Sequence, residues 1–121
     1  MTGPEERIRV LLVEDEPIIA MTAQDMLEAL GCEVVASAAT LDEALAAAAR
    51  GGFDVAMLDI NLNGVASLPV ADALKAAGTP FVFTTGYGAE GCGPHRDVPL
   101  VTKPYRIVDL DVALRLATGR G

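Results

Sequence analysis

Short runs of apolar, β-branched residues alternate with longer helix-forming stretches along the chain, and this alternation limits the possible folds more than any other feature. The first run covers residues 8–13 and stops abruptly at the acidic residues 14–16. Similar runs at 32–38, 55–58, 81–85 and 98–102 predict four more short strands. Nearly continuous apolar character is typical of strands that are buried on both faces of a sheet.

Helix signals fill most of the intervals between these strands. Pro17 suits the first turn of a helix that continues from Ile18 to Leu30, with Gly31 as its C-terminal stop. Thr40 and Glu43 predict a capping box at the start of an alanine-rich helix that ends at Arg50. A third helix is predicted from residue 67 or 69 to residue 77. A last helix is predicted over residues 105–117, with a buried face formed by Ile107, Leu110, Ala113 and Leu114.

The interval from Gly86 to Pro99 departs from this regular pattern. It is crowded with glycine and proline where the alternation calls for a fourth helix, so any helix there is expected to be short or mobile. His95, the single histidine, lies in this interval with no second metal ligand at helical or turn spacing. We therefore expect His95 to be a solvated loop residue.

Strands that alternate with helices pair in parallel through right-handed crossovers, which predicts an α/β fold with a sheet covered on both sides. A length of 121 residues suits one domain, residues 1–121, with a core from about Ile8 to Ala117. Cys32 and Cys92 have no metal-type spacing and are expected to be free, buried or half-buried thiols.

Charge and hydropathy narrow the classes of partner. The formal net charge of -8 disfavours direct binding of nucleic acid or of an anionic membrane surface. No apolar run approaches the ~20 residues that span a bilayer, and the N-terminus lacks the layout of a signal peptide. The expected location is the cytoplasm, and the expected partners are cations and proteins.

Chemically active residues follow four of the five predicted strands. Glu14 and Asp15 follow the first strand, Asp59 the third and Lys103 the fifth, while Thr85 ends the fourth. In an open parallel sheet, the carboxyl ends of the strands form one working edge. Three clustered carboxylates need more positive charge than one lysine supplies, and a hard divalent ion with oxygen ligands, Mg²⁺, is the natural candidate.

With these residues in place, the sequence resembles the receiver domain of two-component response regulators over residues 8–117. The motifs that carry the resemblance are Glu14-Asp15, Asp59 followed by Asn61, Thr85-Gly86, and Lys103-Pro104-Tyr105. The resemblance implies a flavodoxin-like, doubly wound sheet of five parallel strands in the order 2-1-3-4-5.

The resemblance also implies a role for each matched residue. Asp59 would be the phosphoacceptor, Thr85 would hydrogen-bond a phosphoryl oxygen, and Lys103 would pair with the phosphoryl charge. The implied ligands of Mg²⁺ are Asp15 directly, Glu14 mainly through water, Asp59, and the main-chain carbonyl of Asn61. The implied partners are a sensor histidine kinase or phosphotransfer protein, and a downstream protein target that is met near strands four and five.

Two positions and one segment depart from the common receiver pattern. Leu100 stands where many receivers have an aromatic residue that moves inward on activation, so that part of the usual switch is not expected here. Glu14 stands where Asp is more frequent, and its extra methylene should preserve a water-mediated metal contact with altered affinity. Residues 83–88 resemble the Phe-x-Thr-Gly-Tyr-Gly variant of receivers.

Two functions other than that of a stand-alone receiver are compatible with an acidic site at the strand ends. A small Mg²⁺-dependent phosphatase or phosphotransferase of the dehalogenase type would carry a second Asp two residues after its nucleophile, and that position is Asn61. A pseudo-receiver that serves only as a scaffold would have lost the acceptor or the lysine, and Asp59 and Lys103 are both present. The receiver is therefore the preferred interpretation, acting as a phosphoacceptor signalling domain and not as an enzyme on external substrates.

Overall fold

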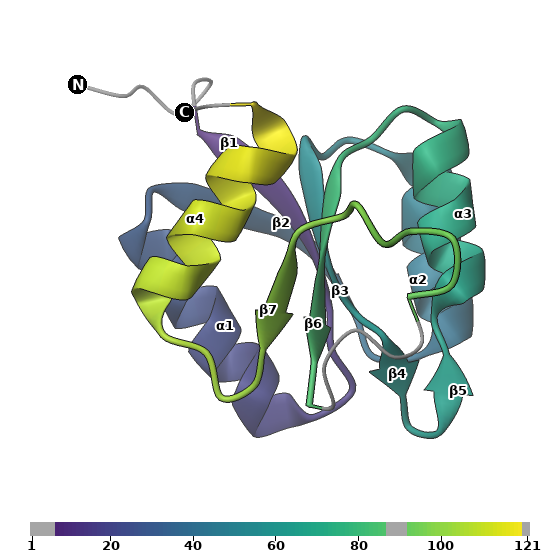
Figure 1. Cartoon of the computed structure of the whole chain (residues 1–121), viewed down its shortest axis with the longest axis horizontal. Coiled ribbons are helices and arrows are strands. Elements are labelled where there is room, and N and C mark those ends of the chain that lie inside the picture. Colours follow the sequence, from purple (N-terminus) through teal and green to yellow (C-terminus); the bar gives the residue numbers. More distant parts are fainter. Residues whose placement is uncertain (1–6, 87–91, 120–121) are drawn as a thin grey trace.

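The computed structural model describes residues 7–86 and 92–119, which form a five-stranded parallel sheet flanked by helices (Figure 1). The sheet order is β2-β1-β3-β6-β7. Its strands are β1 (Ile8–Val13), β2 (Cys32–Ala38), β3 (Val55–Asp59), β6 (Phe81–Thr85) and β7 (Leu100–Thr102). The labels β4 (Asn61–Leu62) and β5 (Val65–Ala66) belong to a small separate hairpin, so this order is the predicted 2-1-3-4-5 arrangement.

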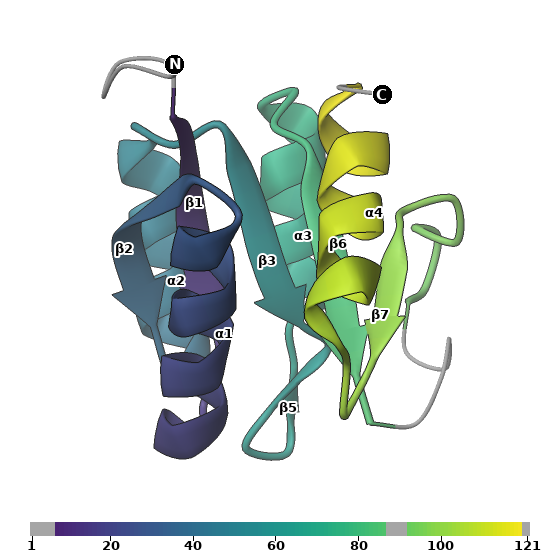
Figure 2. The same ribbon diagram turned by 90° about the vertical axis from the view of Figure 1, so that its left-hand side faces the viewer.

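Two helices cover each face of the sheet. Helices α1 (Pro17–Ala29) and α4 (Ile107–Thr118) lie on one face, and α2 (Leu41–Arg50) and α3 (Leu68–Ala76) lie on the other, as Figure 2 shows. The strand pleat explains this sandwich, because successive side chains point to opposite faces. Val10 and Leu12 pack with α1 and α4, whereas Leu11 and Val13 pack with α2 and α3. The predicted doubly wound α/β fold is confirmed.

Local sequence signals predict the ends of the first two helices accurately. Pro17 is the first residue of α1, and Gly31, two residues after the helix, has a φ of 81° that favours glycine. At α2, the Thr40 hydroxyl accepts a hydrogen bond from the Glu43 N–H at 3.2 Å, and the Glu43 carboxylate accepts one from the Ala39 N–H at 2.8 Å. The capping interaction predicted for Thr40 and Glu43 is therefore present, with Ala39 as the second donor.

The last helix differs from its prediction. It begins at Ile107 instead of Tyr105 because Arg106 is extended and donates its N–H to the Asp109 carboxylate at 3.0 Å, which caps the first turn. The predicted buried face is correct for Leu110, Ala113 and Leu114, but Ile107 is 40% exposed because it lies in the first turn at the open end of this face.

The interval between β6 and β7 contains a second difference. Residues 92–99 form turns and bends without a helix, and the rest of the predicted short helix, residues 87–91, lies outside the described residues. The fifth strand begins at Leu100, two residues later than predicted, because the Val98 N–H donates to the His95 carbonyl at 3.4 Å within a turn.

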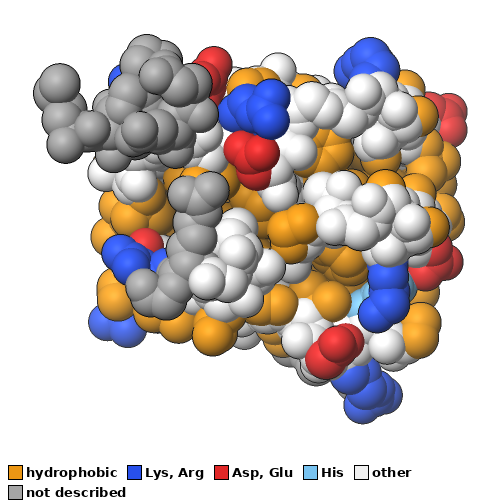
Figure 3. Space-filling view, turned by 90° about the horizontal axis from the view of Figure 1, so that it is seen from above, with side chains coloured by type: hydrophobic (Ala, Val, Ile, Leu, Met, Phe, Trp, Pro, Cys, Tyr) orange, Lys and Arg blue, Asp and Glu red, His pale blue; other side chains and the backbone are white. Residues whose placement is uncertain are grey.

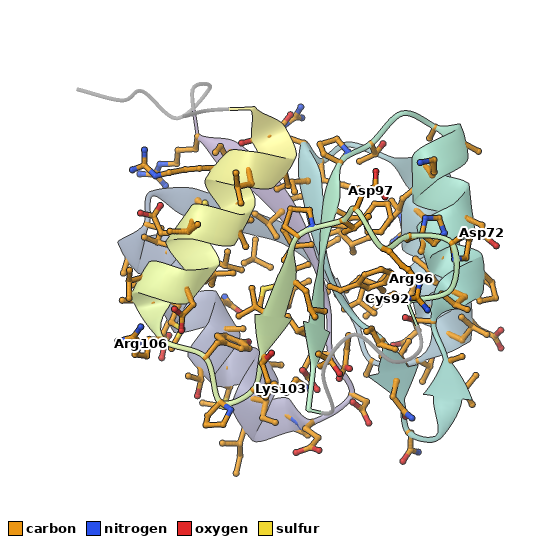
Figure 4. The ribbon with its side chains drawn as sticks, in the orientation of Figure 1. Asp72, Cys92, Arg96, Asp97, Lys103 and Arg106 are labelled. Atoms are coloured by element: carbon orange, nitrogen blue, oxygen red, sulfur yellow. The ribbon has the colours of Figure 1, made fainter. Side chains whose placement is uncertain are left out.

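The prediction that His95 is solvated was wrong, since its side chain is only 3% exposed. Its ring lies edge-on to Phe81 and Phe83 of β6, with centroids at 5.7 and 6.3 Å. Its Nε2 lies 2.7 Å from Oδ1 of Asp72 on α3, and Figure 4 shows Asp72 beside the segment that carries Cys92 and Arg96. Residues 92–99 contain no helix, and within them His95 and the buried Cys92 pack with the pair Phe81 and Phe83.

The described helices are all short, and one end of the molecule carries side chains of both charges. None of the described helices is long and apolar enough to cross a bilayer. Figure 3 views the end of the sheet opposite the carboxyl ends of the strands, and its visible Lys, Arg, Asp and Glu side chains are interspersed. Cys32 and Cys92 are both free and buried, as predicted.

Candidate functional site

The carboxyl ends of β1, β3, β6 and β7 meet at one edge of the sheet around an open pocket of about 710 Å³. The parallel direction of the strands is the cause, because every strand then delivers its last residue to the same edge. The polar residues that line this pocket from the strand ends and the following turns are Asp15, Glu16, Asp59, Asn61, Asn63, Thr85 and Lys103. The predicted site residues therefore come together, with Glu14 buried next to the pocket lining.

Lys103 links two of the predicted carboxylates. Its Nζ lies 2.8 Å from Oε1 of Glu14 and 2.8 Å from Oδ2 of Asp59. Figure 4 places Lys103 just beyond the lower end of β7. The backbone holds this position as well, because the Lys103 N–H donates to the Thr85 carbonyl at 2.7 Å. The ammonium is therefore positioned by two neighbouring strands and by two anionic partners.

The three acidic residues form a compact oxygen cluster. Glu14, Asp15 and Asp59 each offer a carboxylate oxygen, and these atoms all lie within 4.8 Å of one another. Hard divalent cations prefer such an all-oxygen set, whereas softer metals favour imidazole or thiolate ligands. The donor chemistry at this edge of the sheet therefore fits Mg²⁺.

The crowding of charge changes how these groups bind protons. Burial raises the pKa of Glu14 to about 7, and the charge of Asp59 adds to the rise, although hydrogen bonds from Lys103 and from the Glu16 N–H oppose it. Burial acts to lower the pKa of Lys103, but its hydrogen bonds to Asp59 and Glu14 outweigh that effect and raise it. The cluster keeps Lys103 charged and gives Glu14 a pKa close to neutral pH until another cation enters.

Both carboxylate oxygens of Asp59 have hydrogen-bond partners. Oδ2 accepts from Lys103, and Oδ1 accepts from the Asn61 N–H at 3.1 Å. The side chain of Asn61 accepts from the Gly64 N–H at 2.7 Å and is thereby used in the hairpin turn. Asn63 and Gly64 have positive φ values of 56° and 87°, which the Asn-Gly pair of a tight hairpin tolerates. The predicted turn after Asp59 is thus a short β-hairpin.

Two residues at this site, Tyr105 and Ser67, have no role in the sequence interpretation, although Tyr105 belongs to one of the quoted motifs. Tyr105 lies near the charged cluster, and burial together with the charge of Glu14 raises its pKa to about 12. Ser67 is fully buried, and its hydroxyl donates to the Asp59 carbonyl at 2.6 Å. Serine before a helix predicts an N-cap, so the local pattern did not indicate this longer-range contact.

The structure describes Leu100 fully and the segment 83–88 only in part, and both differ from the common receiver pattern. Leu100 pairs with Phe83 across β6 and β7 and packs, partly buried, against the core on the α2 and α3 side. The motif at residues 83–88 is described only up to Gly86, because Tyr87 and Gly88 lie outside the described residues. The resemblance to the Phe-x-Thr-Gly-Tyr-Gly variant therefore stays a prediction.

Comparisons with known proteins agree with the geometry. A model of the response regulator receiver domain family matches residues 10–95. The phyllosphere-induced regulator PhyR of Methylorubrum extorquens is 34% identical over 115 residues, which cover 89% of this chain and 42% of PhyR. The chain thus spans less than half the length of this curated relative.

Two solved structures share the fold over nearly their whole length. SdrG from Sphingomonas melonis Fr1 is 43% identical, with a TM-score of 0.80 over 89% of this chain and 93% of SdrG. The receiver (REC) domain of Erythrobacter litoralis PhyR is 29% identical, with a TM-score of 0.83 over 98% of this chain and 95% of that domain. Together with the family match, these similarities show that the chain belongs to the response regulator receiver domain family.

Proposed function

We propose that Asp59 is the phosphoacceptor and takes a phosphoryl group from a sensor histidine kinase or phosphotransfer protein in a Mg²⁺-dependent step. The observation that carries this proposal is the placement of the Asp59 carboxylate at the pocket, 2.8 Å from the Lys103 ammonium and within the oxygen cluster of Glu14 and Asp15. Charged groups are thus assembled around a single acidic nucleophile.

In the transfer step, a carboxylate oxygen of Asp59 attacks the phosphorus of phosphohistidine. A new P–O bond forms while the P–N bond breaks, and the imidazole nitrogen leaves with the bonding electron pair and takes up a proton. Such transfers depend mainly on in-line positioning and on neutralising charge at the phosphoryl oxygens. Lys103 would pair with one of these oxygens, and the Thr85 hydroxyl would donate to another.

The residues that would hold Mg²⁺ are Asp15 directly, Glu14 mainly through water, Asp59, and Asn61 through its main-chain carbonyl. The hydrogen bond from the Gly64 N–H to the Asn61 side chain supports the main-chain role, because it uses the side-chain oxygen in the turn. When bound, the ion supplies positive charge that offsets the carboxylates and the incoming phosphoryl group.

The signal would pass to a protein target through the surface near β6, β7 and the segment between them. At pH 7 a phosphoryl group of about -1.5 to -2 charges would replace the single negative charge of the carboxylate, next to a segment whose described part lacks helix. Shifting this segment from a 1:99 to a 99:1 ratio of two conformations would need about 5.5 kcal/mol of differential stabilisation. We therefore expect phosphorylation to shift the populations only in part, and binding of the partner to complete the change. The excess of acidic residues disfavours nucleic acid as the direct partner.

Incubation with Mg²⁺ and acetyl phosphate, followed by mass spectrometry, tests the proposal. Wild-type protein should gain one phosphoryl group, and Asp59→Asn should gain none. Asp25→Asn removes a carboxylate that is exposed on α1 and serves as the matched control, with labelling like the wild type. Labelling that persists in Asp59→Asn, or fails to depend on Mg²⁺ when EDTA is added, contradicts the proposal.

The same assay addresses the alternatives. Rapid multiple turnover of external phosphate esters is expected for a phosphatase and would contradict the receiver assignment of Asp59. Absence of any modification in the wild type, with acetyl phosphate or with a phosphotransfer protein, is expected for a scaffold.

A further inference from the structure

Ser67 occupies an unusual position between β5 and α3. It is the N-cap residue of α3 and is fully buried, with 0% of its surface exposed. An N-cap serine normally accepts a hydrogen bond from an N–H of the first turn. Here its hydroxyl points back toward β3 and approaches the Asp59 carbonyl at 2.6 Å and the Ile60 carbonyl at 3.1 Å.

The end of a β ladder explains why the Asp59 carbonyl needs this donor. The Ile60 N–H donates to the Thr84 carbonyl of β6 at 3.0 Å. Because the N–H and C=O of a trans peptide unit point in opposite directions, the Asp59 carbonyl points away from β6, toward the β1 side. The pairing between β1 and β3 ends at Val13 and Leu58, one residue before Asp59, so the ladder offers no donor to the Asp59 carbonyl. The Ser67 hydroxyl takes the place of the next ladder donor.

The helix does not require the hydroxyl as a cap. Pro69, in the first turn, has no N–H to satisfy. The Val70 N–H donates to the Ser67 carbonyl at 2.9 Å, so the backbone of Ser67 already serves the helix. The Ser67 N–H also donates to the Ile60 carbonyl at 2.9 Å, which closes the base of the β4–β5 hairpin.

We propose that Ser67 is a positioning residue for phosphoryl transfer and that it acts by holding the peptide units on either side of Ile60. The second of these units carries the Asn61 N–H, which binds Oδ1 of Asp59 at 3.1 Å. Rotation of either unit would move the carboxylate relative to Lys103 and would also move the Asn61 backbone. This inference rests on the proposed phosphoacceptor role of Asp59.

The test compares Ser67→Ala with Val70→Ala in the full chain, with acetyl phosphate and saturating Mg²⁺. Val70 is fully buried on α3, so its truncation destabilises the same helix without removing a hydrogen bond to Asp59. Ser67→Ala should lower the maximal phosphorylation rate about tenfold with little change in the half-saturating acetyl phosphate concentration, as expected for misplacement by a fraction of an ångström. Val70→Ala should retain the wild-type rate.

Rescue provides a second readout. Ser67→Thr keeps a hydroxyl donor and should react within about twofold of the wild type, since the geometry and not the side-chain size sets the rate. The inference is overturned if Ser67→Ala reacts as fast as the wild type, if Val70→Ala is slowed equally, or if a stably folded Ser67→Thr is as slow as Ser67→Ala. Failure of the wild type itself to be labelled at Asp59 would instead refute the proposed function.

Discussion

Replacing Glu14 with glutamine should stabilise the metal-free protein at alkaline pH while weakening its response to Mg²⁺. The Glu14 side chain is 3% exposed, shares Lys103 with Asp59, and has a pKa raised from 4.5 to about 7, first by burial and then by the charge of Asp59. Ionised Glu14 is therefore a cost to the folded state when no cation other than Lys103 is present. Glutamine keeps a carbonyl oxygen for the Glu16 N–H and carries no charge.

The sign follows from proton linkage. Between pH 4.5 and about 7, the folded protein holds a proton on Glu14 that the unfolded chain releases, so the stability from this group falls as pH rises through the interval. A rise in pKa from 4.5 to about 7 corresponds to a ceiling of about 3 kcal/mol. The adjoining solvent-filled pocket and the lost attraction to Lys103 reduce the expected gain to about 1–2 kcal/mol at pH 8.

Urea unfolding in EDTA at pH 4.5 and pH 8 measures this difference. At pH 8 the Glu14→Gln midpoint should exceed that of the wild type by about 0.5–1 M for a typical urea dependence, and at pH 4.5 most of the gain should vanish. Glu33→Gln removes a carboxylate that is exposed on β2 and serves as the matched control. A Glu14→Gln effect that does not change with pH, or a less stable variant at pH 8, would refute the reasoning.

Three further variants test contacts at the pocket, at the start of α2 and beside β6. Lys103→Ala leaves Glu14 and Asp59 without their shared cation and should cost about 2–3 kcal/mol at pH 8 in EDTA urea melts, with less loss at pH 5. The same variant should still accept a phosphoryl group but lose the phosphorylation-induced change in amide exchange over residues 92–98; an unchanged exchange response would contradict this. Thr40→Ala removes the α2 cap and should cost about 1 kcal/mol, measured against Thr22→Ala on the exposed face of α1. His95→Ala should cost about 2–3 kcal/mol and raise exchange over 92–98, because it empties a buried site beside two phenylalanine rings; a stability equal to the wild type would contradict its role as an anchor.

Local sequence patterns predicted the structure correctly where residues close in the sequence determine it. The bounds of β1, β2 and β6 agree with the prediction, because a short run rich in apolar and β-branched residues between turn or polar residues is visible without knowing its partners. The α2 cap was predictable for the same reason, since its donors and acceptors lie within four residues of one another. The meeting of Asp59, Thr85 and Lys103 at one edge followed from parallel strand direction alone.

Contacts between distant segments were not predictable in this way. His95 is buried because Asp72, 23 residues earlier, and the β6 rings surround it, whereas its own neighbours resemble those of a solvated loop. Ser67 has the local pattern of a helix cap, but the early end of β1 leaves the Asp59 carbonyl as its partner.

What this sequence determines by itself is the order of strands and helices and the kinds of groups at the strand ends, because short-range periodicity, caps and strand direction control them. The tertiary structure alone decided that the Lys103 ammonium bridges Glu14 and Asp59, that His95 packs against the aromatic rings of β6, and that the Ser67 hydroxyl binds the Asp59 carbonyl. The physical reason is that burial and hydrogen-bond partners depend on which distant segments pack together, and no local pattern carries that information.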